Sequence, residues 1–214
     1  MLTDNPDRVS SIIPNPWLEL FADARPGDKF AKLVKWENDS LPSLLQDADK
    51  ISAGPKPFHS GSVLGHMARC MNECAGDPLA VWFAMAHDAG KLSTPKSMLP
   101  HHYGHEKRGG DIAILWAMQM NLPPDWGKHG EFAACQHMRA AKFFRMRPGK
   151  KLDLLKRIAQ KGIANSFWKL IDADTKHNYS AIMLPLGERV AEWEGLPEQR
   201  QIGLLAELCK NKNI

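Results

Sequence analysis

The stretch DPLAVWFAMAHDAGK, from Asp77 to Lys91, decides the fold of this chain. Asp followed by Pro is the favoured order for a helix cap and the first helical residue. The next eight residues, 79–86, are all apolar, so this helix has no polar face to turn toward water. We therefore expect a central, buried helix that ends near Gly90 and carries adjacent His and Asp side chains at its end.

Outward from this stretch, the remaining chain predicts further helices and no strands. Apolar residues recur at three-and-four spacing in 63–74, and Pro and Gly separate the segments. The other helices are expected at 17–24, 28–36, 42–48, 106–120, 125–146, 152–160, 164–175, 186–193 and 198–210. Loops are expected at 52–57 and 93–104, with a turn at Pro148-Gly149. The fold class is therefore predicted to be all-α.

The length of 214 residues is that of one compact domain with room for a small appended part. We expect an N-terminal helical extension at 1–57, a core at 58–180 and C-terminal helices at 181–214. Hydrophobic residues make up 43% and charged residues 24%, which excludes a disordered chain. The longest apolar run is far shorter than the ~20 residues of a membrane span. With no signal-peptide pattern and four cysteines without a CxxC pair, a reduced, cytoplasmic setting is expected.

The net charge of +4 is unevenly distributed. Nine basic residues and one acidic residue, Asp153, lie between Arg139 and Lys161. Such a local excess favours a phosphorylated or nucleic-acid partner. A solvated helix face explains the same pattern, and composition does not choose between the two.

The histidines are concentrated in one third of the chain, with seven of nine between His59 and His129. The His87-Asp88 pair at the end of the apolar helix has two explanations. In one, the imidazole favours the C-terminal end of the helix dipole and the carboxylate makes a local turn. In the other, both side chains bind a metal, because imidazole and carboxylate are ligands of first-row divalent ions.

Other helices offer more ligands of the same kind. His66 lies on the buried side of its helix, His105 opens a helix, and His137 has inward spacing. Asp172 and Asp174 both end an apolar helix, and periodicity alone does not choose between them. Helices converging in a bundle can bring such groups together, and no sulfur ligand is expected among them. Loop or capping positions give three further histidines weaker claims: His101, His102 and His129.

The motifs that carry a family resemblance run in order along the chain. They are FHSG at 58–61, VLGH at 63–66, AHDAGK at 86–91, Thr94-Pro95, and PHHYGHE at 100–106 followed by Gly109. The sequence resembles the HD superfamily of metal-dependent phosphohydrolases. It is most similar to the HD domain at the C-terminal end of many bacterial tRNA nucleotidyltransferases. The resemblance covers about residues 15–180 and implies an HD-domain helical bundle.

The resemblance implies six metal ligands: His66, His87, Asp88, His105, His137 and Asp172. In members with two metals, Asp88 bridges them, and His105 and His137 hold the second. Alignment on the preceding Leu-Ile favours Asp172 over Asp174. The implied cofactor is one divalent ion or two, and Mn, Ni, Co, Mg, Fe and Zn are not distinguished.

A bound divalent ion lowers the pKa of water and polarises a phosphoryl oxygen. Asp88 is then expected to bind metal and orient that water, and Lys91 to offset phosphoryl charge. The alternative for Lys91 is a basic residue that favours a helix C-terminus. Further substrate-binding residues are expected at Arg108, Lys142 and Arg145.

The function implied by the resemblance is hydrolysis of phosphate esters of nucleotides or RNA ends. The activity would be of the phosphomonoesterase or 2′,3′-cyclic phosphodiesterase type. The expected partner is a phosphorylated small molecule or nucleotide, with RNA as an alternative and no membrane. A second hypothesis is an RNA- or tRNA-binding HD module with weak or no catalysis, and a third is a regulatory nucleotide-signal hydrolase. Nothing in the sequence resembles a nucleotidyltransferase head, so no CCA addition is expected; substrate, pathway and oligomeric state stay open.

Overall fold

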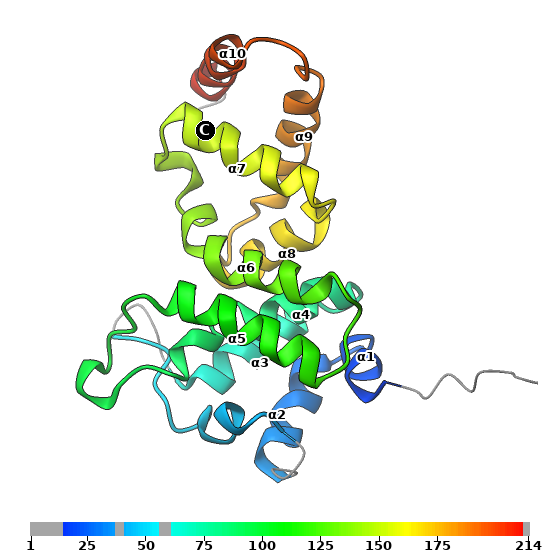
Figure 1. Ribbon diagram of the computed structural model, residues 1–214, viewed down its shortest axis with the longest axis vertical. Helices are drawn as coiled ribbons and strands as arrows, with labels where there is room; N and C mark the ends of the chain where they lie inside the picture. Colours follow the sequence, from blue (N-terminus) through cyan, green and yellow to red (C-terminus); the bar gives the residue numbers. More distant parts are fainter. Residues whose placement is uncertain (1–14, 37–40, 56–60, 212–214) are drawn as a thin grey trace, which may run out of the picture.

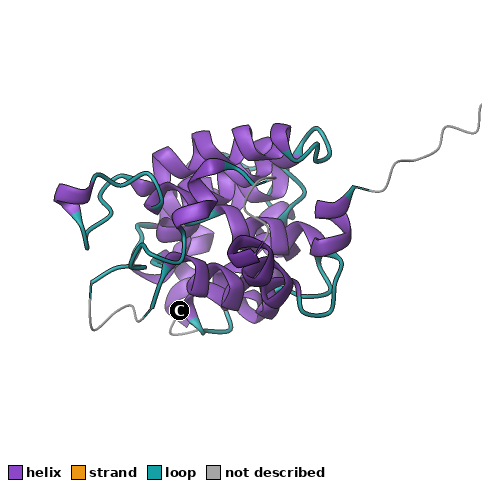
Figure 2. Cartoon of the chain, turned by 90° about the horizontal axis from the view of Figure 1, so that it is seen from below, coloured by secondary structure: helices purple, strands orange, loops and turns teal. Residues whose placement is uncertain are grey.

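The computed structural model describes residues 15–36, 41–55 and 61–211, and within them it is built of helices (Figure 1). The α-helices are α1 (Pro16–Phe21), α2 (Pro26–Trp36), α3 (Val63–Glu73), α4 (Pro78–Ala86), α5 (His105–Gln119), α6 (Trp126–Ala140), α7 (Pro148–Gln160), α8 (Ala164–Thr175), α9 (Ser180–Ala191) and α10 (Glu198–Asn211). Figure 2 shows helices and loops but no strand in these ranges, where the sole β-type pairing is an isolated bridge between Ser52 and Ser62. The all-α prediction is confirmed.

Helix α4 lies at the centre of the molecule, as its sequence predicts. Every side chain from Ala80 to Ala86 is fully buried. Asp77 caps the helix by accepting a hydrogen bond from the Ala80 backbone at 3.0 Å, and Ser166 of α8 donates to the same carboxylate. Such a cap contributes about 1 kcal/mol. The cap therefore fixes the start of α4 and ties α8 to it.

Three helices, α3, α6 and α8, pack directly on α4, and α5 pairs along α6. The Trp82 indole of α4 donates to the carbonyl of Trp126 at the start of α6, at 2.8 Å. Beside it, a Cβ at Gly130 would meet Trp82 atoms at 2.7 Å. In Figure 1, α7, α9 and α10 stand together above this core. The packing leaves the C-terminal end of α4 facing the ends of α3, α5, α6 and α8.

Several helix boundaries differ from those expected: α1 ends at Phe21, and the helix expected at 42–48 is a short 3-10 helix, η2 (Ser43–Asp47). Helix α6 ends at Ala140, and a short 3-10 turn, η5 (Phe143–Arg145), follows it. Pro148 is the first residue of α7 and makes no separate turn, because its fixed φ suits a helix start. Helix α9 begins at Ser180 and continues through Pro185.

The start of α3 is capped by Ser62, which accepts a hydrogen bond from the Gly65 backbone at 3.2 Å. The neighbouring residues 58–60, which carry part of the family motif, lie outside the described residues. No described helix is long and apolar enough to cross a membrane.

Candidate metal centre

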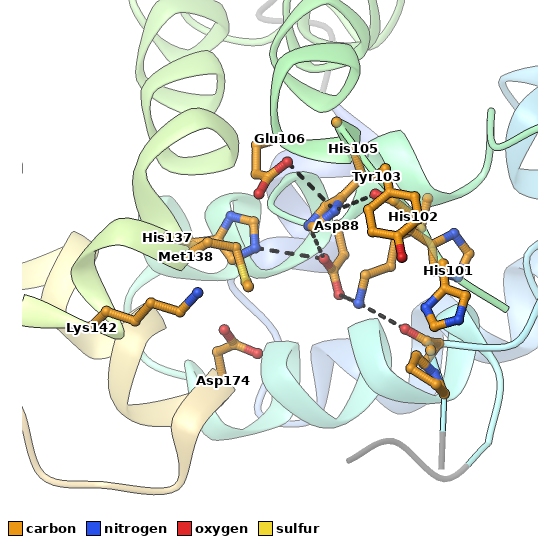
Figure 3. Close-up of a pocket in the computed structure, with 15 residues that line it drawn as sticks. Asp88, His101, His102, Tyr103, His105, Glu106, His137, Met138, Lys142 and Asp174 are labelled. Carbon is orange, nitrogen blue, oxygen red and sulfur yellow. Dashed lines mark hydrogen bonds and ion pairs between the residues drawn. The ribbon is translucent and has the colours of Figure 1, made fainter. Parts of the chain in front are cut away.

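Five helices bring six imidazole and carboxylate side chains to one place beside the C-terminal end of α4. They are His66 of α3, His87 and Asp88 after α4, His105 of α5, His137 of α6 and Asp174 of α8. Figure 3 shows part of this cluster, with carboxylate and imidazole groups turned toward a common hollow. Residues far apart in sequence thus form one site because their helices end against α4.

A first group of candidate metal-ligand atoms surrounds Nε2 of His66. Its Nε2 lies 3.2 Å from Nε2 of His87, 3.2 Å from Oδ1 of Asp174 and 3.3 Å from Oδ2 of Asp88. Nδ1 of His66 accepts from the guanidinium of Arg69 at 3.2 Å, so without an ion its Nε2 carries one proton and can donate to only one of these partners at a time. A cation among the four atoms would satisfy all of them.

A second group lies on the other oxygen of Asp88. Its Oδ1 faces Nε2 of His105 at 3.4 Å and Nε2 of His137 at 3.7 Å. Both Asp88 Oδ1 and His105 Nε2 are buried without a hydrogen-bond partner within the described ranges. Leaving such atoms unsatisfied costs about 1–3 kcal/mol each. The residues therefore fit a second divalent ion, with Asp88 between the two groups.

The orientation of three histidines matches that of metal ligands. Each places Nδ1 against a backbone carbonyl three residues earlier, and the carbonyl can only accept, so Nδ1 carries the proton. The pairs are His87 with Ala84 at 2.9 Å, His105 with His102 at 2.8 Å and His137 with Ala134 at 2.8 Å. Such a bond fixes the tautomer that presents an unprotonated Nε2 to a metal.

Asp174, and not Asp172, is the acidic residue that α8 delivers to the cluster. Asp172 instead accepts from the backbone of Ser180 at 3.0 Å and caps α9. The two residues are separated by about 200° around the helix, so one choice excludes the other. This geometry corrects the expectation of Asp172. Alignment on the preceding apolar residues carries no information about α9, whose first residue donates to Asp172.

Electrostatics keep the carboxylates ionised. Burial disfavours the charged form of Asp88, but His87 and Lys91 outweigh it and hold the pKa of Asp88 well below its usual range. Burial acts likewise on Asp174, where His66 and His87 prevail and lower the pKa. For His87, burial is outweighed by Asp88, and the pKa is raised. Burial and the neighbouring His87 lower the pKa of His137 to about 4.

Lys91 lies within the cluster. It is 6% exposed, and its ammonium contacts Oδ2 of Asp88 at 2.8 Å and donates to the carbonyl of Ala53 at 2.8 Å. The ammonium therefore neutralises part of the charge on Asp88 and links the site to the loop before α3.

A cavity of about 410 Å³ opens onto the cluster. Its lining includes Lys91, His101, Tyr103 and Lys142, and Figure 3 shows the amino group of Lys142 close to Asp174 and His137. Lys142 also lines a second hollow of about 590 Å³, together with Arg145. Both residues are exposed, and neither pairs with an acidic side chain in the ranges that the structure covers. They are therefore available to an anionic ligand.

Arg108 has a different position from the one expected. Its guanidinium donates to Ser93 and Thr94 side chains and to the Tyr103 carbonyl, at 3.1, 3.1 and 2.7 Å. It does not line the cavity at the cluster. Arg108 thus holds the loop before α5, and the expectation that it binds substrate is corrected.

The remaining histidines and basic residues are engaged elsewhere. Both ring nitrogens of His102 are bonded, to Thr94 and to the carbonyl of Ser52, at 2.8 Å each. His129 does not belong to either ligand group. In the basic segment, Arg139 pairs with Asp153, whereas three cations lie over aromatic rings: Lys151, Arg157 and Lys161. Four of the nine basic residues in this segment therefore have partners within the fold.

One candidate ligand was not expected from the sequence. The thiol of Cys70 lies 3.8 Å from Nε2 of His66, inside the first group. The signal was present, because Cys70 follows His66 by four residues and shares its helix face. Its apolar spacing favoured a core assignment instead, so no sulfur was predicted in the site.

Fold and site together define an all-α protein with a candidate metal centre of His and Asp residues. The chain is similar to proteins named multifunctional CCA protein. The one from Aromatoleum aromaticum is 30% identical over 155 residues, covering 66% of this chain and 36% of the relative. Another, from Chromobacterium violaceum, is 27% identical over 181 residues, covering 80% of this chain and 44% of the relative.

A third relative of that name, from Verminephrobacter eiseniae, is 46% identical over 61 residues, which are 28% of this chain and 15% of the relative. The alignments thus span less than half the length of these relatives. No protein-family model and no solved structure matches the chain.

Proposed function

We propose that this chain is a metal-dependent phosphohydrolase that acts on phosphate esters of nucleotides or RNA ends, as a phosphomonoesterase or 2′,3′-cyclic phosphodiesterase. The observation that carries the proposal is the position of Asp88, whose two oxygens face separate groups of ligand atoms. This arrangement supports a bridging carboxylate. The relatives' name, multifunctional CCA protein, supports a substrate of nucleic-acid type.

The residues of the first group, His66, His87 and Asp174, would hold one divalent ion with Asp88. His105 and His137 would hold the second on the other oxygen. When bound, such ions lower the pKa of water and polarise phosphoryl oxygens. Asp88 itself accepts hydrogen bonds and fixes the position of groups beside it, because Lys91 holds its carboxylate in place.

Lys142 binds the substrate's phosphate in this proposal. Its exposed ammonium lines the cavity on the side where Asp174 and His137 lie. A positive charge in this position attracts the anionic phosphate ester and offsets negative charge that develops on its oxygens. Lys91 acts on the site by holding the Asp88 carboxylate and does not itself bind the phosphate, because its ammonium already contacts Asp88 and the Ala53 carbonyl.

The test combines metal analysis with a phosphate-release screen. The full chain, purified without chelator, should contain a divalent ion and release phosphate from nucleoside monophosphates or 3′-phosphorylated oligonucleotides, or open 2′,3′-cyclic nucleotides to 2′- or 3′-monophosphates, which chromatography detects. His66→Ala should lose both metal and activity, whereas His129→Ala, which lies outside both groups, should keep both. Binding of RNA without any phosphate release would favour the alternative, a non-catalytic RNA-binding module.

A further inference from the structure

Cys70 belongs to the first ligand group by position. The ligand atoms of His66, Cys70, His87 and Asp174 all lie within 4.8 Å of one another. Cys70 is fully buried, one helical turn after His66 in α3, and its Sγ points at the same Nε2 that faces His87 and Asp174. Three elements thus place one sulfur, two nitrogens and one oxygen around a common point.

Together with Oδ2 of Asp88, which lies 3.3 Å from His66 Nε2, these four atoms give the first ion five candidate ligands. Bonds of about 2.0–2.1 Å to nitrogen or oxygen and 2.3 Å to sulfur, at tetrahedral angles, put ligand atoms about 3.3–3.5 Å apart. His66 Nε2 lies 3.2 Å from both His87 Nε2 and Asp174 Oδ1, and His87 lies 3.7 Å from Asp174. The Sγ of Cys70 is 3.8 Å from His66 Nε2. The two nitrogens and the oxygen therefore need shifts of only a few tenths of an ångström, and Sγ lies within 4.8 Å of each of them.

A structural explanation for Cys70 is available and is weaker. Its thiol contacts the carbonyl of Ala173 at 3.7 Å. Cys74 lies one turn after Cys70, at the C-terminal cap of α3. Its thiol makes the same kind of contact, with the carbonyl of Lys169 at 3.8 Å. Carbonyl contact thus needs no metal centre, yet only Cys70 of the pair lies in the ligand group. Cys74 provides a matched internal control.

We propose that Cys70 Sγ is a ligand of the ion held by His66, His87 and Asp174, so that this site prefers Zn²⁺ or Co²⁺ over Mg²⁺. This inference rests on the proposed function, because both require a divalent ion bound at this cluster. Thiolate is a soft ligand that suits zinc and cobalt, whereas magnesium takes oxygen ligands. As the sulfur–metal bond forms, the S–H bond breaks and its proton passes to the buffer.

The decisive measurement is a Co²⁺ titration of the full chain, freed of metal, followed by absorption. A cobalt–thiolate bond gives a near-ultraviolet charge-transfer band that nitrogen and oxygen ligands do not give. We expect this band to grow until the first site is full. It should be absent from Cys70→Ser and intact in Cys74→Ser.

A second readout is metal preference. Loss of a residue that hydrogen-bonds to a metal ligand typically weakens metal binding about 10–100-fold. Loss of a ligand itself should weaken binding at least as much. Cys70→Ser should therefore weaken Zn²⁺ at least about tenfold and leave Mg²⁺ affinity unchanged. Cys74→Ser should alter neither.

The outcomes separate this inference from the proposed function. Co²⁺ bound without the band in the unmodified chain overturns ligation by Cys70 and leaves the metal-dependent function standing; this result needs no variant to fold. A band that persists in Cys70→Ser also overturns it. A chain that binds no divalent ion overturns both proposals together.

Discussion

Asp88 is the residue on which the candidate site depends most. Its carboxylate is almost completely buried, and it contacts ligand atoms on both sides together with the ammonium of Lys91. Burying a carboxylate is costly unless it is paired. Lys91 supplies that pairing, so the two residues stabilise each other whether or not an ion is bound.

Replacing Asp88 should therefore affect stability as well as chemistry. Asp88→Ala should abolish metal binding and phosphate release. It should also lower the free energy of unfolding by about 3–5 kcal/mol, because Lys91 loses its partner in a buried position. Chemical denaturation and metal analysis measure the two effects.

The double variant Asp88→Ala/Lys91→Met is the control for that prediction. It removes the unpaired charge, so stability should recover while metal binding and hydrolysis stay lost. Full turnover by Asp88→Ala would contradict the assignment of Asp88 to the site.

Metal affinity should fall as pH falls through the raised pKa of His87. Metal binding requires an unprotonated His87, whose pKa is raised in the metal-free protein by Asp88 and Asp174, which outweigh burial. Below that pKa, one competing proton on His87 lowers affinity by up to about tenfold per pH unit, in addition to the proton that Cys70 would release. Asp88 and Asp174 have lowered pKa values and stay ionised, so they do not shift this window.

Calorimetric titration with Zn²⁺ between pH 5 and 8 checks this expectation, with circular dichroism to show that the fold persists. His137, whose pKa is lowered to about 4, stays neutral throughout this range. Affinity that is flat across the whole range would contradict a role for His87 as a ligand.

At the scale of elements, the short 3-10 turn η3 (Ala89–Lys91) determines where α5 begins. A Cβ at Gly90 would lie 1.9 Å from the carbonyl oxygen of His105 and 2.5 Å from the backbone nitrogen of Gly109. Only glycine permits this approach of two backbones. The approach is what puts His105 beside Asp88.

Gly90→Ala should therefore push α5 away from η3. Such overpacking costs about 1–3 kcal/mol or more, and the affinity for a second ion should fall because His105 moves. Thermal unfolding and metal titration report the two effects. Gly187→Ala is the control: its Cβ meets no atom within 4 Å, and it should be neutral or stabilise by about 0.5–1 kcal/mol. Equal effects of both changes would contradict the argument.

The basic segment yields a prediction about substrate length. Lys142 lines both cavities, whereas Arg145 lines only the second. Lys142→Ala should lower kcat/KM for any phosphate ester on the order of 10- to 100-fold, the worth of a charged hydrogen bond. Arg145→Ala should do so only for substrates with a second phosphate, such as an oligonucleotide.

Arg147→Ala is the control for both, since Arg147 is exposed and lines neither cavity. An RNA substrate should also show affinity that falls steeply with salt, because each phosphate contact releases a counterion. If Lys142→Ala leaves kcat/KM unchanged, Lys142 does not bind the substrate.

The sequence predicted those elements whose signals are local. The cap at Asp77 and the apolar run after it were enough to predict α4. Helix α9 was expected at 186–193, but it starts at Ser180 and contains Pro185. That start depends on Asp172, which caps the helix from another element, and such tertiary contacts leave no periodic signal.

In the candidate site too, local sequence signals were predicted and features that depend on tertiary contacts were missed. His-Asp at the end of an apolar helix, with imidazoles on other inward faces, was visible in the sequence. The position of Asp174 depends on the rotation of α8 against α3 and α4, which no single helix determines. Arg108 fits a phosphate contact by charge alone, but the loop before α5 uses its donors.

At the scale of the whole molecule, the hydrophobic core surrounds α4 and extends from Leu20 to Cys209 without using any charged site residue. The cluster lies at the edge of this core. Burial of apolar surface stabilises the fold by about 25 cal/mol per Å², and none of that depends on an ion.

Removing metal should therefore leave the chain folded. After chelation, the helical circular-dichroism signal should persist and unfolding should stay cooperative. Adding a divalent ion at about 100 times its Kd should raise stability by about 2.7 kcal/mol and raise Tm accordingly. Collapse of the helical signal on chelation would contradict this view and make the ion a structural one.

The ammonium of Lys91, held between Asp88 and the Ala53 carbonyl, has a consequence for the life of the protein in a cell. It acts as a built-in counter-ion, so a newly made chain can fold before any metal arrives. In the proposed function, a divalent ion therefore binds to a chain that is already folded, and it can be removed again without unfolding the protein.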